Sequence, residues 1–572
     1  MRNPAQSILK LPLSQTLGET VRELIDTGVS KFPHLKNTAE DIINGREDVR
    51  PLDPDVMAKL DNAMMVLFQP EGLPPKTVEA HTPIKAAILQ GWAEHTEDPD
   101  AETLAKWLQQ GAPLGFDEPI ERTGVFPTCA DVPIHRAEEM ELLKDVDSWQ
   151  NWPSATEEAE DLQKLIREAQ LKGFCRVLED NDENRKLLEG PQVLNKLGVV
   201  VKFQGPDNKK KSRIIWDMRE SGVNQRCDPS ERILLPRLMD AVHDALDLMR
   251  AGKTPILAAV DIADAFHNVP AGRDKKYTMA LTELENGKRR FVLYDVLVFG
   301  SRSSPTIWGR FAAFLGRAIS AVAPEARTQV YVDDPLLTLP NEAEESIDIL
   351  TRILIFTNLL GYPLKLSKAS AGQTVKWIGA SIHIDNVREK VEVTIPEDKV
   401  IKLLSECKTM LKSPVVGLKA LRSLAGSLSF VAGLVPVMRP FLSPLWAAMS
   451  KDATYDGSAK GGSSTSRTAG KLVHTKRIAA SLNWVVALLE NEHGTLKRTF
   501  DPNLEDTGWE VITDACPWGI GGVLYHNKVA KRWFASHLPS ELLNKFKASV
   551  GDPSFNTLWE AVALLVALRP VP

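Results

Sequence analysis

Cysteine is scarce in this sequence and is not arranged for cross-linking or metal binding. Five cysteines are spread widely among 572 residues, and no two of them form a C-x-x-C pair. An odd and scattered set argues against a disulfide framework and against a zinc site, and it favours a reducing compartment. We therefore expect an intracellular protein of the cytoplasm or the nucleus.

Long apolar runs and an excess of positive charge are also missing. No stretch of about 18 apolar residues occurs, and the N-terminus lacks the apolar core of a signal peptide, so we expect neither a membrane span nor secretion. The net charge is −6, and a surface for nucleic acid would therefore have to be local. One stretch qualifies, although it can also be a solvated loop tip: Lys202, Lys209, Lys210, Lys211 and Arg213.

What is present fits a globular protein of several domains. Hydrophobic residues make up 43% of the chain and charged residues 25%, which allows a large buried core. The length suggests about three or four domains. Residues 1–150 carry short helical patterns at 76–92 and 100–110 but no chemical motif. Residues 153–173 predict a single helix with Ser154 as its N-cap.

The middle of the chain alternates between strand and helix patterns. The predicted elements are a hairpin with a basic tip at 195–216, a strand at 257–266, a helix at 303–321, a hairpin with two aspartates in its turn at 327–340, a helix at 341–361 and a strand at 374–385. This alternation predicts an α+β domain with helices on one face of a sheet.

The last third of the chain changes character twice. Helices at 396–411 and 416–432 precede a Gly/Ser/Thr-rich stretch at 456–470, which is typical of a flexible linker. A helix at 471–490 follows. The remaining predicted elements are short strands at 509–514, 519–526 and 529–535 and a helix near 555–568.

Two predicted strands end in acidic residues, Asp261 with Asp264 and Asp333 with Asp334. Phosphoryl transfer needs divalent cations that neutralise phosphate charge, and two of them about 4 Å apart can clamp the attacking and the leaving oxygen. Mg²⁺ prefers hard oxygen ligands and keeps several waters, so two or three carboxylates suffice. Taken alone, an Asp-Asp pair has a simpler interpretation, because aspartate favours turns.

Six short motifs resemble those of reverse transcriptases and follow the order seen in that family. They are RIIWDMR at 213–219 followed by Asn224, DIADAF at 261–266, LVFGSRSSP at 297–305, YVDD at 331–334, LGYPLKLSK at 360–368 and WIG at 377–379. Val298 departs from the family pattern, which usually has proline there. The resemblance implies a right-hand polymerase with fingers, palm and thumb.

The resemblance also implies a role for each matching residue. Asp261, Asp333 and Asp334 would be the catalytic residues and would bind two Mg²⁺ or Mn²⁺ ions. The ring of Phe266 would exclude a ribose 2′-hydroxyl and favour deoxynucleotides, and it can be a core residue as well. The other implied nucleotide-binding residues are Lys202, Arg213, Asp264, Phe299, Gly300 and Lys365, with Lys368 competing for the general-acid role of Lys365. Trp377 and Gly379 would form the primer grip.

The C-terminal segment resembles the beginning of a ribonuclease H domain. TDACPWGIGG at 513–522 is similar to the first strand of that fold and supplies Asp514, and LWE at 558–560 is similar to its helix and supplies Glu560. Such a site uses further aspartates, and the sequence stops at Pro572. We therefore expect an incomplete and inactive ribonuclease H-like α/β domain, or a truncated gene model or pseudogene of a longer polyprotein. Together with 421–446 and 535–539, the tail resembles DIRS-like retrotransposons.

These observations predict four segments and one principal function. The segments are an N-terminal region of unknown function at 1–150, fingers and palm at 151–385, a thumb and connection at 386–500, and the partial ribonuclease H-like domain at 501–572. The function is DNA synthesis from dNTPs on a primed RNA or DNA template. The alternatives are a decayed or domesticated relative that binds nucleic acid without catalysis, and an RNA-dependent RNA polymerase, against which Phe266 argues.

Overall fold

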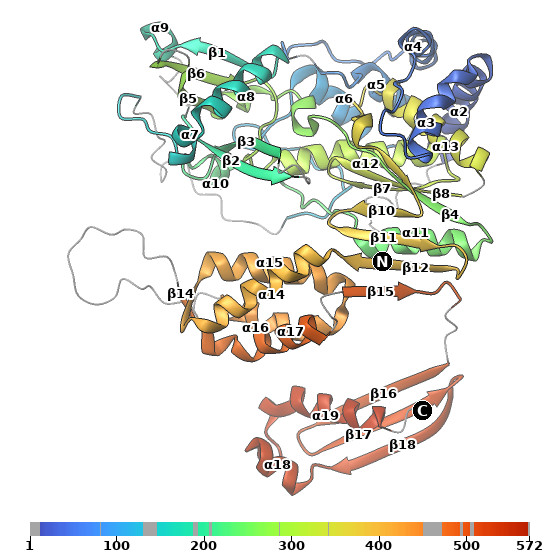
Figure 1. Ribbon diagram of the computed structural model, residues 1–572, viewed down its shortest axis with the longest axis vertical. Helices are drawn as coiled ribbons and strands as arrows, with labels where there is room; N and C mark the ends of the chain where they lie inside the picture. Colours follow the sequence, from blue (N-terminus) through green and yellow to red (C-terminus); the bar gives the residue numbers. More distant parts are fainter. Residues whose placement is uncertain are drawn as a thin grey trace. The chain divides into compact units, whose positions relative to one another are not determined.

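The computed structural model describes residues 12–80, 82–129, 146–186, 193–204, 209–284, 287–340, 343–449, 472–491, 496–503 and 508–569. The chain forms two compact units, Met1–Pro502 and Asn503–Pro572 (Figure 1). The boundary between them follows strand β15 (Leu496–Phe500), close to residue 501, where the sequence suggests that the last domain begins.

Helices build the N-terminal part of the first unit: α2 (Pro12–Lys31), α3 (Asn37–Ile43), α4 (Pro54–Phe68), α5 (Ala86–His95) and α6 (Ala101–Gln110). The helix expected at 76–92 begins only at Ala86, because Pro83 disfavours helical backbone in the residue before it. The apolar sides of these helices share one hydrophobic core with the central elements of the chain. The N-terminal region and the centre therefore fold as one body.

A sheet, a hairpin and three helices make up the segment expected to form the fingers: α7 (Pro153–Glu157), α8 (Ala159–Leu171), β1 (Cys175–Glu179), α9 (Asp182–Arg185), β2 (Lys196–Gln204), β3 (Lys209–Asp217), β5 (Met279–Leu284) and β6 (Lys288–Tyr294). Strands β2 and β3 form the expected hairpin, and the order of the sheet is β1-β6-β5. The single helix expected at 153–173 is broken at Glu158. Ser154 does not cap a helix, because its hydroxyl instead accepts a hydrogen bond from the Val199 main-chain nitrogen at 3.2 Å.

The palm sheet lies at the centre of the first unit (Figure 1). Its order is β7 (Arg327–Tyr331), β8 (Asp334–Pro340), β4 (Pro255–Ala259) and β9 (Ser370–Gly372), with every neighbouring pair antiparallel. The helices around it are α10 (Val223–Arg226), α11 (Leu238–Arg250), α12 (Ser304–Val322) and α13 (Ala343–Leu359). The strand expected at 257–266 ends at Ala259, and a turn and a short 3₁₀ helix at Ala265–Asn268 follow.

Helices cover both faces of this sheet, whereas the sequence pattern suggested one. Ile256 and Ala258 of β4 belong to the core that contains α12 and α13, and Leu257 and Ala259 belong to the core that contains α11. Every residue of β4 is buried. A strand that is apolar without alternation is typical of a sheet with two covered faces, and the PILAA sequence of β4 is the signal for that arrangement.

The thumb-side part of the first unit combines a second sheet with helices. Its sheet order is β10 (Thr374–Trp377), β11 (Ala380–Asp385), β12 (Lys390–Ile395) and β15. The other elements are α14 (Glu397–Lys412), β13 (Val415–Gly417), α15 (Leu418–Leu434), α16 (Arg439–Ala447), β14 (Leu472–His474) and α17 (Ala479–Asn491). The helix expected at 471–490 starts late because its first residues pair with β13. The linker expected at 456–470 lies outside the described residues.

The second unit is a small antiparallel sheet with two helices: β16 (Trp509–Cys516), β17 (Gly519–His526), β18 (Val529–His537), α18 (Ser540–Phe546) and α19 (Asn556–Leu568). The three strands and the last helix lie where the sequence predicts them. Trp559 of α19 is fully buried against Ile520 and Leu538. In the part of the chain that the structure describes, no helix is both long enough and apolar enough to cross a membrane.

Candidate active site

A cavity of about 700 Å³ opens between the fingers and the palm of the first unit. Its walls come from the end of α8, from β3, from the turn after β4, from residues 298–299, from the β7–β8 turn and from residues 364–368. Five of the predicted nucleotide-binding residues line it, namely Arg213, Asp264, Phe266, Phe299 and Lys365, together with the catalytic candidates Asp261 and Asp333. Segments that lie far apart in the sequence therefore meet at one hollow.

Main-chain hydrogen bonds fix the two acidic segments side by side. The Ile262 nitrogen donates to the carbonyl of Asp333 at 2.8 Å, and the Lys365 nitrogen donates to the carbonyl of Asp261 at 2.8 Å. The first bond continues the pairing of β4 with β8 beyond the strand ends, and the second joins Asp261 to the segment that precedes β9. Asp261 and Asp333 consequently face the same cavity from neighbouring strands. Asp334, the first residue of β8, is not among the lining residues.

The YVDD motif forms a tight turn with strained backbone. Tyr331 pairs with Asp334 across the hairpin, and Val332 between them has a φ of +57°. A β-branched residue rarely adopts that conformation, because its side chain crowds the backbone. Trp308 of α12 donates its indole N–H to the Val332 carbonyl at 2.7 Å. The surrounding structure thus holds the turn in place.

Burial and mutual repulsion raise the pKa values of the two turn aspartates. Partial desolvation in the cavity raises the pKa of Asp333, and the charge of Asp261 adds to the effect. Burial raises the pKa of Asp334 to about 6, helped by the charges of Asp333 and Asp261. Carboxylates that repel one another in this way are stabilised by a cation placed among them.

One cation is supplied by the chain itself, because the Lys368 ammonium donates to the Asp261 carboxylate at 2.5 Å. The donor chemistry of Asp261 and Asp333 suits Mg²⁺ or Mn²⁺, which prefer carboxylate oxygens. Among the described residues, however, no set of three or more His, Cys, Asp or Glu side chains is positioned to hold a metal ion. The structure thus brings two of the predicted ligands to the cavity, and Lys368 occupies the side of Asp261 that a metal would share.

The lining of the cavity also contains basic residues, among them Lys211, Arg213, Lys365 and Lys368. Burial lowers the pKa of Lys211, and the charges of Arg213, Lys368 and Lys365 lower it further. The mutual repulsion of these groups favours an anionic ligand between them. Lys202 lies opposite Lys211 in the hairpin and is exposed, and it does not line the cavity.

Two further lysines in this area already have carboxylate partners. Lys172, at the end of α8, donates to Asp264 at 2.6 Å and lies over the ring of Phe174. Lys210 donates to Glu158 at 2.6 Å. The sequence motif does not identify Lys172, because it lies outside the six boxes, although it lines the cavity.

Phe266 and Phe299 lie together on the floor of the cavity. Their ring centroids are 4.8 Å apart, and Phe266 is nearly buried, so it is both a core residue and a lining residue. Gly300 does not line the cavity. Its φ is +120°, and a Cβ there would lie 2.0 Å from the Trp216 carbonyl oxygen, so close packing against β3 requires the glycine.

The predicted primer-grip residues lie beside the catalytic turn. Trp377 donates its indole N–H to the Asp334 carbonyl at 3.0 Å and packs edge-on against Tyr331. Strands β10 and β11 replace the single strand expected at 374–385. Ile378 and Gly379 lie between these two strands, and both have positive φ, as a two-residue hairpin turn requires.

The two predicted ribonuclease H residues both lie in the second unit. Asp514 is on β16, and the carboxylate of Glu560 on α19 accepts a hydrogen bond from the main-chain nitrogen of Ala515 at 3.3 Å. The helix carrying Glu560 packs on the face of the sheet that includes Ala515. Glu560 thus contacts the main chain next to Asp514, whereas the exposed side chain of Asp514 lies on the opposite face of the sheet, because successive strand residues alternate between faces.

Comparison with known families identifies the central part of the chain. Residues 206–382 match the family model described as reverse transcriptase (RNA-dependent DNA polymerase). The chain contains a reverse transcriptase domain. The matched residues include all six motifs and the three aspartates that line the cavity, Asp261, Asp264 and Asp333. A search of curated proteins found no match.

Solved structures similar to this chain include foamy viral protease–reverse transcriptases. One, in complex with double-stranded DNA, is 14% identical, with 91% of this chain and 74% of that chain covered at a TM-score of 0.40. A second such complex is 16% identical, with 82% and 84% covered at a TM-score of 0.39. Scores at this level do not bear on ligands or activity, so the function of the reverse transcriptase domain has to be argued from its own residues.

Proposed function

We propose that this protein synthesises DNA from dNTPs on a primed RNA or DNA template by two-metal phosphoryl transfer. The observation that carries the proposal is the cavity that Asp261 and Asp333 line together with basic residues, within the segment that matches reverse transcriptases. Acidic groups for metal ions and basic groups for phosphates are the two requirements of nucleotidyl transfer.

In this proposal, different residues of the cavity bind the triphosphate and the metal ions. Arg213 and Lys211 reach the cavity from β3 and suit the triphosphate, and the planar guanidinium of Arg213 can bind two phosphate oxygens at once. Asp261 and Asp333 would hold the divalent ions, which supply charge neutralisation and activate the primer hydroxyl when bound. Asp334 supports them from the start of β8. A metal ion at Asp261 would compete with Lys368 for this carboxylate, because the Lys368 ammonium is bonded to one of its two oxygens.

Leaving-group protonation is assigned to the 365–368 segment. Lys365 and Lys368 both line the cavity, and the main chain of Lys365 is bonded to Asp261. An ammonium that approaches the pyrophosphate would supply the proton that its departing oxygen gains. Lys368, once displaced from Asp261, is as well placed for this as Lys365.

Primer extension tests the proposal directly. Purified protein receives a primed RNA template, a primed DNA template, Mg²⁺ and dNTPs, and extended primers are resolved by length. The proposal requires extension by the parent, loss of extension on chelation of Mg²⁺, and a fall of at least about 100-fold for Asp333→Asn, the size typical of lost electrostatic stabilisation.

A matched control guards against a general effect of removing charge. Asp48 is exposed and far from the cavity in sequence, and Asp48→Asn should extend primers as the parent does. Extension by Asp333→Asn at the rate of the parent would remove Asp333 from the site. No extension by a folded parent on either template would reject the polymerase proposal.

One observation favours a second candidate, a nucleic-acid-binding protein without catalysis. Asp261 is engaged by Lys368, and among the described residues no three-ligand cluster is assembled. If Lys368 permanently replaces the metal ion, the domain still offers a basic groove. Salt-dependent binding of a primer–template by a parent that extends nothing, with binding unaffected by Asp333→Asn, would support this candidate.

We also propose that the second unit is ribonuclease H-like and that the protein is of the DIRS-like retrotransposon type. The proximity of Glu560 to the strand of Asp514 supports the first statement. The sequence resemblance of 421–446 and 535–539 supports the second. Hydrolysis of the RNA strand of an RNA–DNA hybrid, compared between the parent and Asp514→Asn, measures whether this unit has activity of its own.

A further inference from the structure

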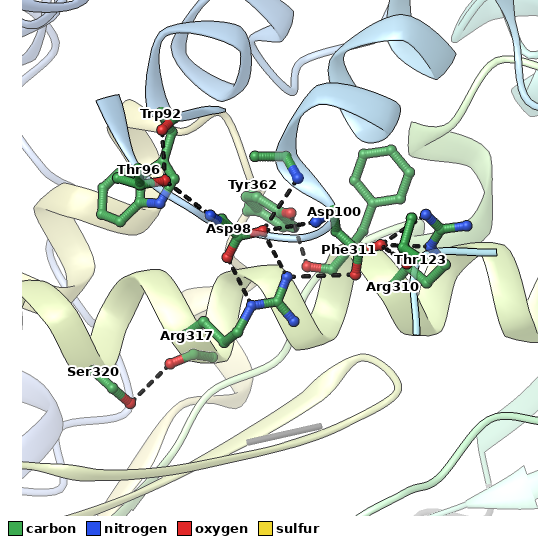
Figure 2. Close-up of polar contacts among 12 residues, drawn as sticks. Trp92, Thr96, Asp98, Asp100, Thr123, Arg310, Phe311, Arg317, Ser320 and Tyr362 are labelled. Atoms are coloured by element: carbon green, nitrogen blue, oxygen red, sulfur yellow. Dashed lines mark hydrogen bonds and ion pairs between the residues drawn. The ribbon is translucent and has the colours of Figure 1, made fainter. Parts of the chain in front are cut away.

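Helix α12 carries two arginines that are buried against the N-terminal region. Arg310 donates to Asp100 at 2.7 Å, and both side chains are fully buried. Arg317 donates two hydrogen bonds to Asp98, at 2.7 and 2.9 Å, and lies 3.4 Å from Asp100 (Figure 2). Asp98 and Asp100 belong to the turn between α5 and α6. Two acids from one segment therefore neutralise two bases from another inside the core.

The turn that holds the acids is itself fixed. The carboxylate of Asp98 accepts from the main-chain nitrogens of Asp100 and Ala101 at 3.0 and 3.1 Å. Thr123 donates its hydroxyl to Asp100 at 2.7 Å. Asp98 is thus held by hydrogen bonds from its own turn and Asp100 by a hydrogen bond from Thr123, while each acid binds an arginine of α12.

The same helix is bonded to both halves of the acidic site. Trp308 donates to the Val332 carbonyl in the catalytic turn, as described above. The Phe311 carbonyl accepts from the Tyr362 hydroxyl at 3.0 Å, and the chain that follows Tyr362 is bonded to the Asp261 segment. Helix α12 is therefore the common support of the β7–β8 turn and of the strand end that carries Asp261.

We propose that Asp98 and Asp100 are positioning residues, which set the place of the catalytic turn through α12. The inference rests on the proposed polymerase function. Arg310 and Arg317 are seven positions apart, so they lie on one face of the helix. Apolar contacts alone let a helix slide or rotate by small amounts, whereas paired hydrogen bonds to fixed carboxylates define one position. Trp308 and Phe311, next to Arg310, transmit that position to the site.

The principal variants are Asp98→Asn and Asp100→Asn in the full chain. Each keeps the size of the side chain and removes its charge. We expect kcat for primer extension to fall about 10- to 100-fold, as displacement of a site by a fraction of an ångström does. The KM for dNTP should stay unchanged, because neither residue reaches the nucleotide cavity.

A spectroscopic measurement separates positioning from loss of folding. With ¹⁵N-labelled tryptophan, the indole N–H of Trp308 should shift and exchange faster with solvent in both variants, because its bond to Val332 is disturbed. The indole of Trp216 donates to the Thr278 carbonyl in the fingers and should not change. This readout does not depend on activity, so it judges the inference even if the parent extends no primer.

A matched control uses another ion pair between the same two regions. Asp26 of α2 accepts two hydrogen bonds from Arg352 of α13, each at 3.0 Å. Asp26→Asn also removes an acid that faces a palm helix, but α13 does not bear Trp308 or Phe311. It should leave kcat within about twofold of the parent, since Asp26 is exposed and Arg352 keeps Glu325 as a second partner at 3.5 Å, and should leave the Trp308 resonance in place.

A fourth variant applies if Asp98→Asn and Asp100→Asn fail to fold. Arg317→Lys keeps the charge and removes the planar fork, and it should lower kcat and shift Trp308 to a smaller degree. The inference is overturned if a folded variant of Asp98, Asp100 or Arg317 leaves the Trp308 resonance unchanged. It is equally overturned if Asp26→Asn produces the same loss of kcat and the same shift.

Discussion

At the scale of single residues, the cavity contains charged groups whose pKa values are shifted by burial and by neighbouring like charges. Burial and like charges raise the pKa of Asp333 and lower the pKa of Lys211. Each shift is relieved by a ligand of opposite charge, a cation for the aspartate and a phosphate for the lysine. Under the proposed function, both shifts favour the binding of a nucleotide with its metal ions.

The lowered pKa of Lys211 predicts a pH dependence of nucleotide binding. Lys211 is cationic below its folded-state pKa and loses its charge as the pH rises through that value, which lies below the ordinary 10.5. The KM for dNTP should therefore rise at a lower pH than an ordinary lysine would allow. Lys211→Arg stays charged and should keep KM flat over the same range. Parallel pH profiles of KM for the two proteins measure this, and identical profiles would exclude Lys211 from the triphosphate site.

Phe266 predicts the choice of sugar. Its ring lines the cavity beside Phe299, and under the proposed function we expect it to exclude a ribose 2′-hydroxyl. Phe266→Ala should raise the relative kcat/KM for ribonucleotides by roughly 10- to 200-fold, the range that one small group contributes in a pocket. Phe266→Tyr keeps the bulk and should retain the parent preference. Competition between dNTP and rNTP in primer extension gives the ratio, and no rise in the alanine variant would end the steric role of Phe266.

Which site residues the sequence could predict depends on how local their signals are. Asp261 and Asp333 sit in short motifs, and the structure brings them to one cavity. Trp308 and Lys172 have no such signal, because their roles arise from contacts with Val332 and Asp264 far away in the chain. The motif also could not show why residue 300 has to be glycine, because the atom that excludes a side chain there belongs to Trp216.

At the scale of elements, strands and helices of the palm follow their sequence patterns, and their packing does not. Helix α12 and hairpin β7–β8 lie close to the predicted bounds. The covering of both sheet faces was missed, because a short apolar strand does not show which partners bury it. The break of the helix at Glu158 was missed for a similar reason, because the Ser154 hydroxyl accepts a hydrogen bond from the main chain of β2 and does not cap a helix.

Substitution of two glycines tests how the elements pack, and we expect the two variants to change the free energy of unfolding in opposite directions. Gly300→Ala would push a methyl group into the Trp216 carbonyl at a left-handed position and should lower the free energy of unfolding by roughly 2–4 kcal/mol. Gly426 is exposed within α15, with nothing near its Cβ position, and Gly426→Ala should raise it by about 0.5–1 kcal/mol. Chemical denaturation of both variants measures the difference, and equal effects would contradict the close approach at Gly300.

At the scale of the whole molecule, the division into two units predicts two unfolding events. Trp559 is the centre of the small core of the second unit and is fully buried. Trp559→Ala should destabilise that unit by about 3–5 kcal/mol and leave the unfolding of Met1–Pro502 unchanged. Differential scanning calorimetry should show one transition moving and one staying. If both move together, the units do not unfold independently.

The N-terminal region illustrates what the sequence left open at this scale. Its helical patterns are visible, yet it contains no chemical motif, and its function stayed unassigned. The structure shows that it shares a core with the palm and contributes the buried acids Asp98 and Asp100. In the sequence, Asp98 and Asp100 look like ordinary N-terminal capping residues of a helix, because the arginines that they bind lie more than two hundred positions away.

The four buried charged side chains also limit which amino-acid substitutions this chain can accept. Losing any one of Asp98, Asp100, Arg310 or Arg317 leaves one unbalanced charge among the other three in a dry interior, which is far costlier than losing both members of a pair. Substitutions at these positions should therefore be tolerated together and rejected singly. In a library that randomises all four, surviving clones should retain equal numbers of acids and bases, with two of each, one of each or none.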